Sequence, residues 1–264
     1  MNFLLHWLLS TSLNLISACS ALLILMSILY IIQRLWYHII AYRYGRHWVY
    51  VSGILGVHVH ELSHAALCQF FSHKIKEIVL FKPDGQGTLG TVSHCYNAVN
   101  PWAIIGNFFI GIAPIFGGCA AIALATYLIL PNLEVLDVLY GSSSAEFNID
   151  KLLYLLENMA ITLMNTAENS PLNFACWFYV VASISLHLAP SPTDIKGGIV
   201  GFNFFLFAFS AFKAACDYYH LPIFTAIESY ITAISLQLII SIVTSLTLIT
   251  VFYLPVAIKG LLKR

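Results

Sequence analysis

Long apolar segments dominate this sequence and constrain its fold more than any other feature. Six of them approach the length of about 20 residues that a helix needs to cross a bilayer. A segment in lipid must satisfy its own backbone hydrogen bonds, and uniformly apolar segments of this length are typical of helices rather than barrel strands. The predicted spans are Ser12–Ile32, Val49–Phe71, Trp102–Leu130, Leu172–Leu188, Ile199–Ala215 and Ile231–Leu254.

Composition agrees with a protein that resides in a lipid bilayer. Hydrophobic residues make up 59% of the chain and charged residues only 9%, far from the values of soluble domains. The 12 basic and 12 acidic residues balance, so we expect no nucleic-acid partner. No Lys or Arg lies within Met1–Tyr30, whose apolar stretch is too long for a cleaved signal, so this segment is expected to remain as the first span.

Two connections between the predicted spans carry structural signals. The β-type segments Ile75–Phe81 and Thr88–Val92 flank a turn-rich stretch at 82–87, which predicts a hairpin. The acidic connection Pro131–Pro171 contains apolar residues at helical spacing between Leu152 and Leu163, which predicts a short amphipathic helix. The fold class is therefore an all-α polytopic membrane protein with about six transmembrane helices and a small membrane-associated β-hairpin.

The cysteines show no pattern of a disulfide framework or of a Cys-x-x-Cys metal site. We interpret them as small buried residues. They are Cys19, Cys68, Cys95, Cys119, Cys176 and Cys216.

The second predicted span contains the motif His60-Glu61-Leu62-Ser63-His64. Residues four apart lie on one face of an α-helix, separated by about 6 Å along the axis, so His60 and His64 can bind one ion. Zinc suits two imidazoles, and Glu61 is close enough to accept a proton from a water that attacks a carbonyl. His58 points to another face, where a packing or supporting role is expected.

A catalytic zinc with tetrahedral geometry needs a third protein ligand, with water in the fourth position. Asp194 is the best candidate because it follows the fourth span, in a stretch where Pro190, Pro192 and two glycines are expected to break the helix. Irregular backbone at membrane depth is tolerated where it lines a cavity. An ordinary turn at the membrane interface is the alternative. Nearby His187 either stabilises an oxyanion as a catalytic residue or hydrogen-bonds a neighbouring helix.

These residues resemble the site-2 protease family of intramembrane zinc metalloproteases, as a divergent member. That family combines His-Glu-x-x-His in one helix with an Asn-x-x-Pro-x-Pro-x-x-Asp-Gly type motif in a later one. The resemblance implies one Zn²⁺ held by His60, His64 and Asp194, with Glu61 as general base and His187 in the Asn position. It also implies a membrane protein or peptide substrate, cleaved within the bilayer.

The chain is accordingly divided into an N-terminal helix and basic loop at 1–48, a metalloprotease core at 49–198 and C-terminal transmembrane helices at 199–264. We expect a multi-pass protein of a prokaryotic plasma (inner) membrane, with an organelle membrane as the alternative. No signal in the sequence indicates an oligomeric state.

Two other functions fit the same residues. A non-catalytic metal-binding or zinc transport protein would use the histidines and Asp194 as a passage site. A membrane endopeptidase of the prenyl-protein type would instead take a later glutamate, Glu157 or Glu228, as the third ligand.

Overall fold

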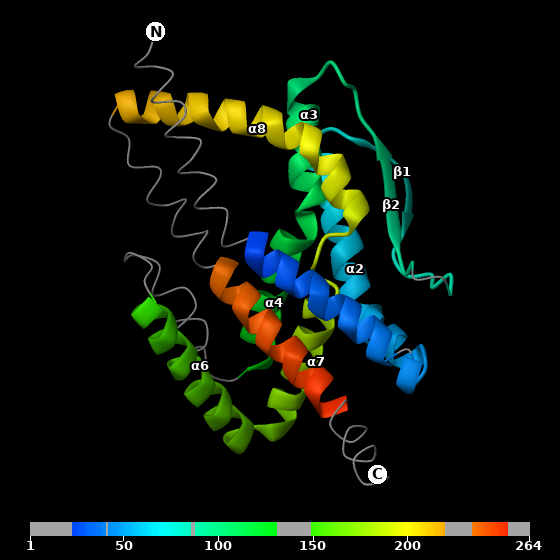
Figure 1. Ribbon diagram of the computed structural model, residues 1–264, viewed down its shortest axis with the longest axis vertical. Helices are drawn as coiled ribbons and strands as arrows, with labels where there is room; N and C mark the ends of the chain where they lie inside the picture. The colour runs from blue at the N-terminus through cyan, green and yellow to red at the C-terminus, as the bar shows by residue number, and fades with distance from the viewer. Residues whose placement is uncertain (1–22, 41, 86–87, 131–148, 220–233, 253–264) are drawn as a thin grey trace, which may run out of the picture.

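The computed structural model describes residues 23–40, 42–85, 88–130, 149–219 and 234–252, and this part of the chain is mostly helical. A two-stranded antiparallel sheet lies at one side of the helices (Figure 1). The labelled elements are α2 (His47–Phe70), β1 (Lys74–Val79), β2 (Thr91–Cys95), α3 (Pro101–Gly111), α4 (Ala113–Ile129), α6 (Ile149–Asn169), α7 (Pro171–Ser185) and α8 (Pro192–Tyr218). Apolar helices at Leu23–Ile40 and Ile234–Phe252 complete the described structure.

Three described helices are long and apolar enough to cross a membrane, which is consistent with a membrane protein. They are Leu23–Ile40, the Pro192–Lys213 part of α8, and Ile234–Phe252. The bent pair α3 and α4 makes a fourth if it counts as one span. The predicted number of six spans is not confirmed, because α7 has only 15 residues and α2, which carries the polar motif, is not among the membrane-length apolar helices.

The first described helix continues to Ile40, so the predicted end of the first span at Ile32 is too early. Arg34 therefore lies inside the helix. Its Nε donates a hydrogen bond to the Tyr30 hydroxyl at 3.0 Å, and its guanidinium lies 5.1 Å from the centre of the Tyr30 ring. This pairing lets a charged residue remain in an apolar helix. The predicted part of this span before residue 23 lies outside the described residues.

The predicted third span is two helices, α3 and α4, bent by 57° at Ile112. Pro114 explains the break, because it has no N–H to donate and its ring crowds the carbonyl four residues earlier. The carbonyl that lacks this partner belongs to Ile110.

The sequence predicted a break in the helix around Asp194, but the break is shorter than expected and ends before Asp194. Helix α8 begins at Pro192, so Gly197 and Gly198 lie inside it, and it runs across the predicted boundary between residues 198 and 199. Two other glycines, Gly111 on α3 and Gly201 on α8, allow close helix packing. A Cβ added at Gly201 would lie 2.5 Å from the Phe108 nitrogen, and one at Gly111 would lie 2.6 Å from the Asp194 carbonyl oxygen. Helices α3 and α8 thus touch backbone to backbone.

The main apolar core lies between α4, α7 and the two flanking apolar helices. Leu29, Ile122, Val181 and Leu238 are all fully buried there. Trp177 reaches the same core from α7 and donates its indole N–H to Thr126 Oγ1 at 2.9 Å. This core fixes α7, and with it the turn that leads into α8.

The predicted hairpin is confirmed, with Ile78 opposite Val92 and a register shift between Ile75 and Glu77. Its second strand begins at Thr91 rather than Thr88. A helix is also confirmed in the acidic connection. In this helix, α6, Met159 is buried, whereas the connection at 131–148 lies outside the described residues.

We expect Gly201→Ala to destabilise the protein by about 1–3 kcal/mol, because the added methyl group overlaps the α3 backbone. Gly197→Ala on the same helix is the matched control, since a Cβ there meets nothing within 4 Å. Thermal unfolding of both variants in detergent checks this. Equal unfolding midpoints would contradict the close approach of α3 and α8.

Candidate metal centre

Helix α2 presents the motif residues to the interior of the protein. His64 and Glu61 are buried, and His60 is mostly so. The Nε2 atoms of His60 and His64 lie 3.2 Å apart, as expected for residues four apart on one helical face. The predicted pair of ligands therefore shares one location.

The other ring nitrogen of each histidine bonds a backbone carbonyl. His60 Nδ1 lies 2.7 Å from the His187 oxygen, and His64 Nδ1 lies 2.8 Å from the Ile110 oxygen. A carbonyl oxygen only accepts hydrogen bonds, so both Nδ1 atoms carry the proton. In the neutral form of each ring, Nε2 is then the nitrogen with the free lone pair, which is the tautomer that metal-binding histidines need.

Prolines explain why these two carbonyls are available. The Ile110 oxygen would accept from residue 114 in a continuous helix, but Pro114 has no N–H. The His187 oxygen lies just beyond the end of α7, followed by Pro190 and by Ser191, whose N–H is bonded to Asp194. Each carbonyl is thus left with a lone pair for a histidine.

Asp194 is held at the start of α8 by a capping box. Ser191 N donates to Asp194 Oδ2 at 2.7 Å, and Asp194 N donates to Ser191 Oγ at 3.2 Å. Pro192 occupies the first turn, where a missing N–H costs nothing. This arrangement fixes the carboxylate before any ligand binds.

The three predicted ligands meet at one point. Asp194 Oδ2 lies 3.8 Å from His60 Nε2 and 3.6 Å from His64 Nε2. Ligand atoms around a tetrahedral zinc lie about 3.3 Å apart, close to these separations. With both rings neutral, two lone pairs and a carboxylate face one another, and a cation at their centre would remove their mutual repulsion. His60, His64 and Asp194 form a candidate metal-binding group.

A cavity of about 580 Å³ opens beside this group, and Glu61 lies in its wall. The hairpin forms part of the same wall through Leu89 to Val92 and His94. The backbone at Gly90 is close to Glu61, since a Cβ added there would lie 2.8 Å from Glu61 Cγ. The general base predicted from sequence thus faces space large enough for a peptide segment.

His187 takes part in the site through its backbone, and its ring is tied on both sides. Tyr37 Oη lies 2.9 Å from Nδ1 and Ser52 Oγ lies 3.2 Å from Nε2. Ser52 itself donates to the Val49 carbonyl at 3.0 Å, so it accepts from Nε2–H, and Tyr37 donates to Nδ1. The contact with a neighbouring helix is therefore present. A catalytic role for the ring stays a prediction. For such a role, His187 would have to give up its hydrogen bond to Tyr37 or Ser52 and form one with the substrate.

Tyr37 and Ser52 were missed by sequence reasoning because no motif marks them. Their contacts with His187 join residues far apart in the chain. The only indication in the sequence was that each is a polar residue within an apolar helix, and many other residues of this chain share that property.

The remaining predicted residues lie away from the candidate ligands. His58 stacks on Phe81 with ring centres 6.0 Å apart, as a packing role requires. Lys196 is exposed, so its charge can point away from the group. Glu157 is exposed on α6 and does not line the cavity. Glu228 lies outside the described residues.

Comparison with protein-family models, with curated proteins and with solved structures finds no match to this chain. Fold and site define its class: a helical protein with membrane-length helices and a candidate His-His-Asp metal centre beside a cavity.

We expect Pro114→Ala to weaken zinc binding about 10-fold, the lower end of the effect of removing a partner of a metal ligand. The new N–H competes with His64 for the Ile110 carbonyl and straightens the junction of α3 and α4. Pro101→Ala is the control, because Pro101 begins α3 away from the ligands. Competition with a fluorescent zinc chelator measures both variants, and equal affinities would refute this role for Pro114.

Proposed function

We propose that this protein is an intramembrane zinc metalloprotease, a divergent relative of the site-2 protease family. One observation carries the proposal. Three lone-pair donors converge at His60, His64 and Asp194, with Glu61 in the wall of the adjoining cavity. The order of the residues along the chain also agrees with that family.

The residues divide the chemistry of peptide hydrolysis between them. His60, His64 and Asp194 would hold Zn²⁺, which supplies a Lewis acid for the scissile carbonyl when bound. Glu61 accepts the proton of the attacking water and returns it to the leaving amine. The backbone carbonyls of Ile110 and His187 keep the two histidines in the required tautomer throughout.

Strand β2 offers a binding mode for a peptide. Within the described residues β2 pairs with β1 alone, and its start lines the cavity. We propose that an extended substrate segment adds to the second edge of β2, where backbone groups can accept and donate hydrogen bonds. The substrate backbone would then lie beside Glu61.

Two other functions compete with this proposal. A zinc transport protein would use the same ligands but would not need Glu61 as a base. A prenyl-protein type of endopeptidase would need a glutamate ligand, and Glu157 lies outside the cavity wall.

The main test compares zinc content with cleavage of a fluorogenic transmembrane peptide in detergent. We expect Asp194→Ala, and the pair His60→Ala with His64→Ala, to lose one equivalent of zinc relative to wild type. Glu61→Gln should keep the zinc and lower cleavage by about 10²–10⁴-fold, because only the base is removed.

Glu157→Gln is the matched control and should change neither quantity. Cleavage that survives Glu61→Gln, or a zinc content that Asp194→Ala leaves equal to that of wild type, would overturn the proposal. Zinc flux into vesicles that depends on Asp194 but not on Glu61 would instead identify a transporter.

Removal of residues 83–87 tests the role of the hairpin. We expect normal zinc content but a loss of peptide cleavage of about 10-fold or more, since shortening the connection between the strands displaces the edge of β2 that would pair with the substrate. Unchanged cleavage would exclude strand addition to β2.

A further inference from the structure

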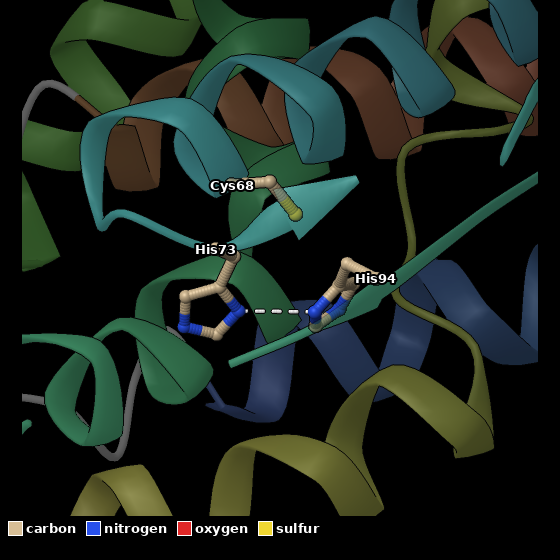
Figure 2. Close-up of side chains that lie close together, drawn as sticks. All are labelled: Cys68, His73 and His94. Atoms are coloured by element: carbon tan, nitrogen blue, oxygen red, sulfur yellow. Dashed lines mark hydrogen bonds between the residues drawn. The ribbon is translucent and has the colours of Figure 1, made fainter. Parts of the chain in front are cut away.

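A second group of metal-ligand side chains lies near the end of α2. Cys68 is in the last turn of α2, His73 follows the turn after it, and His94 is on β2 (Figure 2). The potential ligand atoms of these three residues all lie within 4.8 Å of one another. Residues from two separate elements and the turn after α2 therefore converge on one point.

The hydrogen bonds of His73 set its tautomer. His73 Nε2 lies 2.8 Å from the Ala103 carbonyl oxygen, so Nε2 carries the proton and Nδ1 is unprotonated. That Nδ1 accepts a hydrogen bond from His94 Nδ1 at 3.0 Å (Figure 2), a bond that a metal ion would replace. A backbone carbonyl thus turns the lone pair of His73 toward the other two side chains, as carbonyls do for His60 and His64.

The surroundings of the group are largely closed to solvent. Cys68 is fully buried and His73 is buried, while His94 is partly buried and faces the cavity. His73 also stacks on Tyr96 with ring centres 4.9 Å apart. The unusual backbone of Ser72, with φ of 60°, brings His73 back beneath α2.

We propose that Cys68, His73 and His94 form a second metal site that takes Zn²⁺. A thiolate with two imidazoles suits a borderline-soft ion and does not suit Mg²⁺ or Ca²⁺, which prefer oxygen ligands. A sulfur and a nitrogen on one tetrahedral zinc lie about 3.6 Å apart, a distance that small side-chain rotations reach here. The cysteine loses its proton as the metal binds.

This site is distinct from the His60, His64 and Asp194 group. Cys68 follows His64 by four residues on the same helical face, which separates the two groups by about 6 Å along α2. The second site joins α2 to β2, whose residues line the cavity. Its metal would fix that wall relative to the motif helix, whether or not the protein is a protease.

Sulfur distinguishes the two sites experimentally, because only the second contains a cysteine. The test uses the full chain with His60→Ala and His64→Ala, loaded with Co²⁺ in detergent. We expect one equivalent of cobalt and a thiolate-to-cobalt charge-transfer band in the near ultraviolet. Adding Cys68→Ser should abolish the band.

Cys95→Ser is the matched control, because Cys95 is adjacent to His94 yet outside the group. It should retain the band. Absence of the band, its persistence after Cys68→Ser, or its loss after Cys95→Ser would each overturn the proposal.

X-ray absorption of zinc in the unmodified protein answers the question without any substitution. We expect a sulfur scatterer among the zinc ligands and about two equivalents of zinc. A ligand shell of nitrogen and oxygen alone would overturn the proposal, even if Cys68→Ser failed to fold.

Discussion

Two hydrogen bonds from imidazole to backbone determine what this site can do. His60 and His64 each donate from Nδ1 to a carbonyl oxygen, so in the neutral rings both Nε2 lone pairs are directed at one point. The carbonyls are available because the chain places prolines after them, at Pro114 and Pro190. The kinked helix and the turn before α8 therefore have the same consequence: each supplies an acceptor that sets a histidine tautomer.

The third ligand depends on a different constraint, which is close packing. Gly111 and Gly201 allow α3 and α8 to touch backbone to backbone, and this contact keeps the start of α8 near the histidines of α2. The capping box with Ser191 then orients the carboxylate of Asp194. Helix α3 thus positions two of the three ligands, because the Ile110 carbonyl bonds His64 and Gly111 lets the start of α8 approach closely.

Part of this arrangement was predictable because it is local. The spacing of His60 and His64 defines one helical face, and the hairpin follows from two short β-type segments around a turn. The residues at which helices begin and end were less predictable. The first helix runs past Arg34, whose charge Tyr30 accommodates, and α8 includes Gly197 and Gly198, where a helix break was expected. The cysteines also differ, since Cys176 is exposed and Cys95 partly so.

The sequence by itself determined that the chain has apolar helices of membrane length and that α2 offers a pair of histidines with an adjacent glutamate. Helical periodicity is a property of neighbouring residues, so sequence spacing is sufficient for it. Only the tertiary structure decided which acid completes the group, which nitrogen of each histidine faces it, and that Cys68, His73 and His94 meet. Those features depend on contacts between distant segments, and no local pattern specifies such contacts.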